Sequence, residues 1–584
     1  MHGEVGASQY LFYKEVNHMM KGLGASEGYG IGRVMLISEK NLSYTPREIA
    51  DVDAELERFR TAVKKFTEET LAQAQTVRET VGEKEAKILE GHISIIDDDF
   101  MRGEIENLIS AHQCAESAVE QMCQMFIDMF MASGDELTMQ RAADVRDVRD
   151  SMLAILLGVN EVKISDAPAG TVLVVRELTP SMTAGIKRDN IVGIITETGS
   201  QTSHSAILAR AMEIPAVLSV PNALAQLSTG EQVIVDGFTG DVVTAPAQEV
   251  IDEYTSKRDT YLREKRELEL YRGKPTVSAS GEHYELCCNI GSPKDASKAM
   301  EKDGEGVGLF RTEFLFMDRS SLPTEDEQFD AYKTAAMVLK GKPLIIRTLD
   351  IGGDKEIPYL GLEKEENPFM GFRAIRYCLK NRDMFKSQIK AILRASAFGD
   401  VRIMFPLITA VEELREGRAL VEEAKSDLRA SGIEFNEDIP VGVMTETSAS
   451  GVIADLLAKE ADFFSIGTND LTGYTMACDR GNSNVGYLYS PFQPSVLRLI
   501  KSIIENGVKA GIPVGMCGEA AANPMMIPLL MSFGLTEFSV SAVSVLKVRK
   551  NIAKWTKAEA DEVAAKVMAM STEKEITDYL KTVV

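Results

Sequence analysis

Residues 439–470 of this chain read IPVGVMTETSASGVIADLLAKEADFFSIGTND, and their pattern decides the fold of the C-terminal half. Two short apolar runs, at 439–445 and 463–468, enclose a helical segment, and polar residues follow each run directly. This alternation of buried strand and helix recurs from residue 275 onward. The runs lie at 285–291, 306–310, 343–349, 401–407, 439–445, 463–468, 512–518 and 538–540. Eight strands with helices between them, over about 300 residues, predict a (β/α)8 TIM barrel.

Polar side chains stand at the carboxyl ends of these predicted strands, where barrel enzymes hold their active sites. They are Arg311, Arg347, Arg373, Glu446, Asn469, Asp470, Arg480 and Cys517. Converging arginines bind carboxylate and phosphate groups. Two carboxylates, Glu446 and Asp470, are the number that Mg²⁺ commonly takes from protein. The set predicts a small phosphorylated acid held on a metal ion.

Cys517 lies between two glycines directly after a predicted strand. Its sulfur can therefore approach a bound ligand closely, and this position favours proton transfer. We expect the other six cysteines to be small buried hydrophobic residues.

A second candidate site is contained in TGSQTSHSAILARAMEIP, residues 198–215. The preceding run NIVGIIT, at 190–196, predicts a buried strand, and a helix is expected to begin near Ser203. The first turn of a helix has unpaired N–H groups and the positive end of the helix dipole, which suit an anion such as a phosphate carried on His204. A capping or packing role for His204 is the alternative.

The remaining segments indicate several domains. Strand-forming stretches at 19–45 and 160–248 flank a helical stretch from 46 to 159 that has no proline after Pro46, so the helices are expected to form an inserted subdomain. Residues 1–18 have no clear period and are interpreted as an extension. The densely charged stretch 249–274 predicts an exposed linker helix. The barrel is assigned to 275–584. The glycines at 22–32 favour tight turns, because no phosphate-loop motif follows them.

Composition excludes several functions. The net charge of −24 argues against sequence-independent binding to nucleic acid or an anionic membrane and is compatible with a basic protein partner. No apolar run reaches the roughly 18–20 residues of a membrane helix, so we expect a soluble, cytoplasmic protein. Seven cysteines without a CxxC pair argue against a disulfide framework or a zinc site.

Six motifs together resemble enzyme I of the bacterial sugar phosphotransferase system, the phosphoenolpyruvate-protein phosphotransferases. They are TSHSAILAR at 202–210, GVGLFRTEFLFMDR at 306–319, RTLDIGGDK at 347–355, EENPFMGFRAIR at 365–376, SIGTNDLTGYTMACDRGN at 465–482 and VGMCGEAA at 514–521. The resemblance runs from about residue 22 to the end of the sequence. It implies a multidomain α/β protein in which a swivelling phosphohistidine domain, with a helical subdomain that binds the carrier protein HPr, precedes a barrel that binds phosphoenolpyruvate and dimerises.

The resemblance also implies roles for individual residues. His204 would accept the phosphoryl group of phosphoenolpyruvate and pass it to a histidine of HPr, releasing pyruvate, and Thr183 would hydrogen-bond the imidazole. Cys517 would protonate the enolate carbon. Substrate would be held by Arg311, Arg347, Arg373, Asn469, Asp470 and Arg480, and Mg²⁺ by Glu446 and Asp470.

Three positions depart from the family pattern. Ser200 stands where the family has a second glycine, Ser448 where it commonly has proline, and Ser219 where it has glycine. A serine that had to adopt positive φ would be strained. None of the three departures removes a group that does chemistry, so activity is expected.

Other functions were weighed against this expectation. Pyruvate phosphate dikinase and phosphoenolpyruvate synthase need a large ATP-binding domain before the histidine, and a nitrogen-type enzyme I needs an N-terminal sensory domain; the stretch before His204 has room for neither. A non-catalytic phosphoenolpyruvate or pyruvate sensor acting through HPr is the main alternative. It would be favoured by loss of His204, Glu446, Asp470 or Cys517, all of which are present.

Overall fold

A computed structural model describes residues 19–37, 42–80, 83–132, 136–159, 164–178, 182, 186–201, 203–317, 319–352, 357–482 and 484–584. The chain divides into two compact units, residues 1–265 and 266–584. Within the described residues, no helix is both long enough and apolar enough to cross a bilayer.

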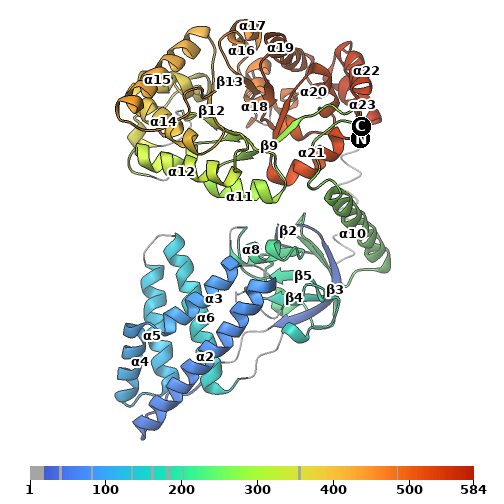
Figure 1. Ribbon diagram of the computed structural model, residues 1–584. Helices are drawn as coiled ribbons and strands as arrows, with labels where there is room; N and C mark the ends of the chain where they lie inside the picture. The colour runs from blue at the N-terminus through green and yellow to red at the C-terminus, as the bar shows by residue number, and fades with distance from the viewer. Residues whose placement is uncertain are drawn as a thin grey trace. The chain divides into compact units, whose positions relative to one another are not determined.

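The first unit contains an eight-stranded sheet in the order β1-β8-β7-β3-β4-β5-β6-β2 (Figure 1). Strands β3, β4, β5 and β6 are parallel, and the others pair antiparallel. Apolar residues from its two faces form separate buried clusters. The strands are β1 (Met19–Lys21), β2 (Leu23–Ser26), β3 (Tyr29–Ile37), β4 (Thr171–Val175), β5 (Ile191–Thr196), β6 (Ala216–Leu218), β7 (Gln232–Asp236) and β8 (Asp241–Thr244).

The glycine-rich segment at 22–32, expected to be a set of turns, forms the edge strand β2 and the start of β3 instead. A Cβ atom on Gly22 would lie 2.4 Å from the carbonyl oxygen of Leu218, and one on Gly24 would lie 2.5 Å from that of Gly237. These glycines therefore allow close backbone approach at the edges of the sheet, a role that composition alone does not distinguish from turn formation.

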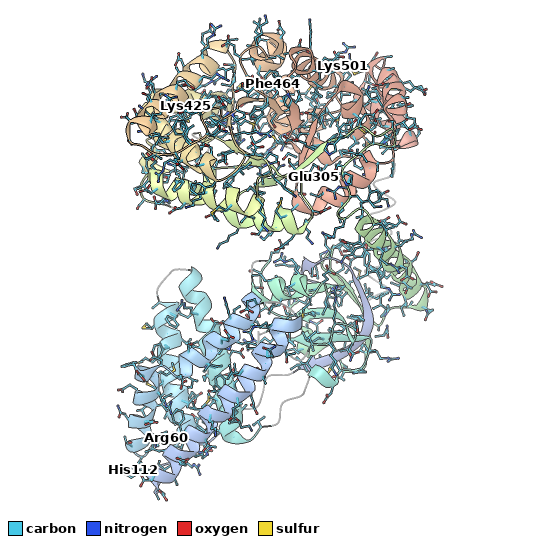
Figure 2. The ribbon with its side chains drawn as sticks, in the orientation of Figure 1. Arg60, His112, Glu305, Lys425, Phe464 and Lys501 are labelled. Carbon is cyan, nitrogen blue, oxygen red and sulfur yellow. The ribbon has the colours of Figure 1, made fainter. Side chains whose placement is uncertain are left out.

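A group of helices is inserted between the parallel neighbours β3 and β4, as the sequence predicts (Figure 1). They are α2 (Val52–Thr80), α3 (Glu83–Ile96), α4 (Asp99–Ser110), α5 (Ala115–Met131) and α6 (Glu136–Leu157). Their apolar faces form a large buried cluster and a smaller one between α2 and α3. His92 is 3% exposed inside this subdomain, and His112 donates a hydrogen bond from Nδ1 to the carbonyl of Ile49 at 2.8 Å, near the end that Figure 2 marks with His112 and Arg60. Both histidines thus serve packing.

The predicted linker is α10 (Gln248–Glu269), a 22-residue helix with one buried residue, Val250. Its first part packs on the α/β domain through aromatic rings: Tyr254 contacts Tyr29 at 5.7 Å and Tyr261 contacts Phe238 at 5.2 Å between ring centroids. The division between the two units falls inside this helix, after Lys265.

The second unit is a closed eight-stranded parallel barrel, which confirms the predicted (β/α)8 fold. All eight predicted runs form strands: β9 (Glu285–Ile290), β10 (Val307–Phe310), β11 (Leu344–Arg347), β12 (Val401–Phe405), β13 (Val441–Thr445), β14 (Phe464–Ile466), β15 (Val514–Met516) and β16 (Glu537–Val540). The barrel closes where the last strand, β16, pairs with the first, β9. Phe464 on β14 is 1% exposed and lies within the unit (Figure 2).

Helices surround the barrel and bury its outer face (Figure 1). They are α11 (Pro293–Glu301), α12 (Glu325–Leu339), α13 (Ala374–Lys380), α14 (Arg382–Ala395), α15 (Val411–Ala430), α16 (Ser448–Val452), α17 (Ala454–Leu457), α18 (Thr468–Met476), α19 (Pro494–Ala510), α20 (Ile527–Phe533), α21 (Val545–Ile552), α22 (Lys557–Met568) and α23 (Glu573–Val583).

Candidate active site at the barrel mouth

The predicted site residues of the barrel follow its strands at their carboxyl ends. Arg347 is the last residue of β11, Glu446 directly follows β13, and Cys517 directly follows β15. Arg311 follows β10, and Asp470 is the third residue of α18, just after β14. Because parallel strands end at the same rim, the fold brings together residues that are more than 200 positions apart.

Asp350 stands at the centre of this site, although the sequence analysis did not single it out. Arg373 donates to its Oδ1 from Nε at 3.1 Å and from Nη2 at 2.6 Å. Arg347 pairs with its Oδ2 at 3.0 Å and with Glu313 at 2.7 Å. Asp350 and Glu313 both lie in the quoted motifs, next to the predicted arginines, and that adjacency was the available signal.

The opposite charges of Asp350 and the two arginines keep these side chains ionised. Burial alone would raise the pKa of Asp350, but Arg347 and Arg373 outweigh it and lower the pKa. Burial would likewise lower the pKa of Arg347, but Glu313 and Asp350 outweigh it and raise the pKa. The arginine pair is therefore permanently cationic, at a place where both side chains are almost fully buried.

Three carboxylates gather beside the arginines. Asp350, Glu446 and Asp470 each offer an oxygen, and these oxygens lie within 4.8 Å of one another. Burial and the neighbouring carboxylates raise the pKa of Glu446 well above its ordinary value, and burial followed by Asp350 raises the pKa of Asp470. Crowded carboxylates with raised pKa values are stabilised by a divalent cation, and oxygen ligands suit Mg²⁺. Asp350 is bonded to both arginines, whereas Asp470 pairs with Arg373 alone, at 3.5 Å, and Glu446 pairs with neither among the described residues, so Glu446 and Asp470 are the more available candidate ligands.

Two buried N–H donors of the arginines have no partner among the described residues. They are Nε of Arg347 and Nη1 of Arg373. A buried charged donor without a partner costs free energy, so these groups are suited to a bound anion. The same mouth thus offers oxygen ligands for a cation and free guanidinium donors for an anion.

The other predicted substrate residues lie at the rim. Arg311 and Arg480 are exposed. Asn469 accepts a hydrogen bond on its carbonyl from the hydroxyl of Tyr489 at 2.9 Å. Arg480 opposes the rise in the pKa of Asp470, and Arg311 helps to lower the pKa of Asp350, so both guanidinium groups are electrostatically coupled to the carboxylate cluster.

Cys517 lies below the rim and is 3% exposed. Its sulfur faces the carbonyl of Ile466 at 3.7 Å. Burial raises the pKa of Cys517 to about 11, with Glu446 raising it further and Arg347 opposing. The side chain is therefore a protonated thiol at neutral pH, as a proton donor must be.

His204 lies in the other unit, as the first residue of α8 (His204–Ala211). Ser203 caps this helix by accepting a hydrogen bond from the N–H of Ala206 at 3.4 Å. Of the two serines that stand where the family has glycine, Ser219 adopts a positive φ of 54° and Ser200 does not. Gly199, directly before Ser200, has a φ of 122°. Thr183 lies outside the described residues.

Comparison with known proteins gives matches along the chain. Three family descriptions match: "PEP-utilising enzyme, N-terminal" at residues 21–141, "PEP-utilising enzyme, mobile domain" at 167–240 and "PEP-utilising enzyme, PEP-binding domain" at 265–557.

Relatives of nearly full length are also similar. A phosphoenolpyruvate-protein phosphotransferase of Bacillus subtilis (strain 168) is 45% identical over 563 residues, covering 96% of this chain and 99% of the relative. The protein of that name from Priestia megaterium is 44% identical over 564 residues, covering 96% and 98%. A solution structure titled "Enzyme I (nEIt)" is 33% identical and covers 41% of this chain and 99% of its own, with a TM-score of 0.38, which is too low to support an argument about the fold.

Proposed function

The chain belongs to the phosphoenolpyruvate-protein phosphotransferases, and we propose that His204 takes the phosphoryl group from phosphoenolpyruvate and passes it to a histidine of the carrier protein HPr. In the first step the bond from phosphorus to the enol oxygen breaks and a bond to an imidazole nitrogen of His204 forms. Cys517 then gives its proton to the enolate carbon, and pyruvate leaves. A neutral imidazole is a good nucleophile near pH 7.

The barrel side chains position the substrate in this proposal. Arg347 and Arg373 bind its anionic groups through their unpaired donors, and the exposed guanidinium groups of Arg311 and Arg480 extend that positive surface to the rim. Glu446 and Asp470 would hold Mg²⁺, which neutralises phosphate charge when bound. Phosphoryl transfer depends on positioning and charge neutralisation, and these residues supply both.

One observation carries the proposal: two buried guanidinium groups have donors without a partner among the described residues, beside a cluster of three carboxylates. A structural ion-pair network would satisfy its own donors. A phosphorylated acid bound to a metal ion needs N–H donors for its anionic groups and carboxylate ligands for the metal, and the barrel mouth offers both.

The test is phosphorylation from labelled phosphoenolpyruvate with Mg²⁺. The intact chain should acquire one acid-labile, base-stable label, and His204→Ala should acquire none. His112→Ala, which removes a histidine of the helical subdomain, serves as the matched control and should label normally. Label on the His204→Ala variant would refute the assignment of the acceptor, and no label on any variant would favour the sensor function.

We infer that the helical subdomain docks the carrier. Asp97, Asp98 and Asp99 are exposed at the junction of α3 and α4, next to Phe100, which is 58% exposed. Met125 and Met129, on α5, are 46% and 54% exposed, and Phe100 contacts Phe126 of that helix at 6.3 Å between ring centroids. An acidic edge around exposed apolar side chains suits a basic partner with an apolar patch, and exposed aromatic residues are typical of binding surfaces.

Substitutions at this surface separate docking from chemistry. Asp99→Lys and Phe100→Ser should each reduce HPr phosphorylation at least about tenfold while leaving His204 labelling unchanged, since tenfold corresponds to about 1.4 kcal/mol of binding. Asp98 should be kept, because it caps α4 through the N–H groups of Phe100 and Met101. Glu434→Lys on the barrel is the charge-matched control. Equal loss of labelling and transfer would contradict the docking assignment.

The chain is also proposed to form a homodimer through the barrel and to act in the cytoplasm. Val452 and Leu456, on neighbouring helices of the barrel unit, are 72% and 44% exposed and offer apolar surface for association. Sedimentation of the intact chain, compared with a Val452→Lys variant, would show whether this surface supports a dimer.

A further inference from the structure

A second group of ligating side chains lies at the opposite end of the barrel from the mouth. Glu285 is the first residue of β9 and Glu537 is the first residue of β16, and the two are paired across these parallel strands. Cys287, two residues after Glu285, shares its face of β9. One ligating atom from each of the three lies within 4.8 Å of the other two.

Glu537 is built into the barrel interior. It is 6% exposed, and its Oε1 has no hydrogen-bond partner among the described residues. A Cβ atom on Gly308 would lie 2.1 Å from this oxygen, and one on Gly515 would lie 3.3 Å from it, so the glycines of the neighbouring strands make room for the carboxyl group. A buried carboxyl oxygen aimed into a cluster without a donor is evidence for an absent partner.

The nearby cation does not supply that partner. Arg402, on β12, pairs with Asp400 at 2.7 Å, and among the described residues no ion pair joins it to Glu285 or Glu537. Glu285 is exposed, so the cluster is open to solvent at this end. Burial raises the pKa of Cys287 well above its ordinary value and that of Glu537 to about 7. A divalent cation can replace the protons that these buried groups otherwise hold.

We propose that Glu285, Cys287 and Glu537 form a binding site for a thiophilic divalent cation, Zn²⁺ or a close analogue, that bridges the first and last strands of the barrel. Zn²⁺ accepts one thiolate and two carboxylates, with bonds of about 2.3 Å to sulfur and 2.0–2.2 Å to oxygen. Mg²⁺ takes oxygen ligands and does not select a thiolate, so this site differs in kind from the one at the mouth. On binding, the Cys287 thiol loses its proton to solvent and its sulfur coordinates the metal.

This site revises an expectation from sequence. The absence of CxxC pairs excludes a site built from clustered cysteines, but here two ligands come from one strand and the third from a strand 250 residues later. Only closure of the barrel brings them together. The cation would link β9 to β16, the pair of strands at which the barrel closes.

Cobalt gives a direct readout with the full-length, chelator-treated protein. Co²⁺ should produce a near-ultraviolet thiolate-to-cobalt absorption band that saturates at one equivalent and is displaced by Zn²⁺. The band should disappear in Cys287→Ser. In Glu537→Gln the affinity for Co²⁺ should fall at least about tenfold, which corresponds to about 1.4 kcal/mol. Phosphorylation of His204 should persist in both variants, so failure of this proposal is distinguishable from failure of the proposed function.

Two cysteine controls assign the band. Cys288→Ser changes the adjacent thiol, which belongs to the outer hydrophobic cluster, and Cys517→Ser changes the thiol near the mouth. Both should retain the band. Its persistence in Cys287→Ser, its loss in Cys517→Ser, or its absence at millimolar Co²⁺ would overturn the proposal.

Thermal unfolding provides a second test that does not depend on the folding of Cys287→Ser. Zn²⁺ at 100 times its dissociation constant should raise the unfolding temperature of the barrel of the unsubstituted protein by at least about 3 °C. At the same Zn²⁺ concentration, Glu537→Gln should show about half that rise or less. An equal rise in Glu537→Gln would overturn the site.

Discussion

Ser219 occupies a backbone geometry that usually selects glycine. Its φ is 54°, and its hydroxyl donates a hydrogen bond to the carbonyl of Gly199, in the turn before His204. A non-glycine residue in this region is strained by about 1 kcal/mol. The hydroxyl bond offsets that strain and ties the loop after β6 to the turn that carries the proposed phosphorylation site.

Two substitutions at Ser219 separate the effect of backbone strain on stability from the effect of the hydrogen bond. Ser219→Ala keeps the strained backbone and loses the hydrogen bond, so the first unit should be destabilised by about 1 kcal/mol. Ser219→Gly loses the bond but relieves the strain, so its stability should stay within about 0.5 kcal/mol of the original. Thermal unfolding measures both. Equal destabilisation by the two variants would show that the strain is negligible.

Cys517 carries the second prediction at the scale of a residue. Cys517→Ala should lower pyruvate formation at least about 100-fold, because the general acid is lost, while the unfolding temperature changes little. With a pKa of about 11, the thiol stays protonated through neutral pH, so its proton-donating form should decline only as pH approaches that value. Coupled pyruvate detection measures the rate, and full turnover in the variant would remove the proposed role.

At the scale of elements, the strands were predictable and the contacts between their loops were not. The eight barrel strands are short, buried and β-branched, and this local pattern identifies them without tertiary information. The edge strand β2 escaped prediction because its glycine and the glycines around it resemble turns. Asp350 was missed although it lies three residues after Arg347. Glu537 was missed because Glu285 and Cys287 belong to the first barrel strand, which only the register of the closed barrel places beside it.

The loop after β12 shows how one site residue supports a neighbouring element. Glu446, after β13, accepts a hydrogen bond from the N–H of Leu407 at 2.7 Å, and Leu407 has the unusual φ of 57°. The carboxylate proposed to bind metal therefore also stabilises a strained turn. The proposed metal-binding role and the structural role thus fall on the same side chain.

Two substitutions at Glu446 should separate these roles. Glu446→Gln keeps an oxygen acceptor for Leu407, so stability should be retained while His204 labelling is lost. Glu446→Ala leaves the buried N–H unpaired and should lower the free energy of unfolding by about 1–3 kcal/mol, with the same loss of labelling. Urea unfolding and the labelling assay measure the two effects. If Gln destabilises as much as Ala, acceptance from Leu407 is not the stabilising contact.

At the scale of the whole molecule, the boundary between the two units falls near the carboxyl end of α10. Lys265 of α10 pairs with Glu213 of the α/β domain at 3.0 Å, whereas Glu267, two residues later, pairs with Lys550 of the barrel unit at 2.6 Å. The chain just beyond α10 is held by Arg549, which is 2% exposed and donates to the carbonyl of Tyr271 at 3.1 Å. Motion between the units is therefore expected to concentrate within the last turn of α10.

Unfolding should reveal the units separately. Arg549 also pairs with Glu305 at 3.3 Å (Glu305 is labelled in Figure 2) and with Asp303, so Arg549→Leu leaves carboxylates without their cation. The barrel transition should fall by roughly 5 °C or more, with the first-unit transition unchanged. Arg58→Leu is the reciprocal control, because Arg58 pairs with Glu55 at 2.7 Å inside the helical subdomain. Calorimetry measures both transitions, and a shift of both in either variant would contradict independent units.

The pairing of β9 with β16 has a consequence for how the polypeptide is made. Translation delivers the first unit complete, but the ring of strands cannot shut until its eighth member leaves the ribosome, roughly 250 residues after the first. At about 5–20 residues per second, this interval lasts on the order of 10–50 s. During it, β9 and its neighbours present uncovered backbone edges, which are sites for aggregation. Nascent chains of this protein should therefore depend on chaperones mainly while the second unit is being synthesised.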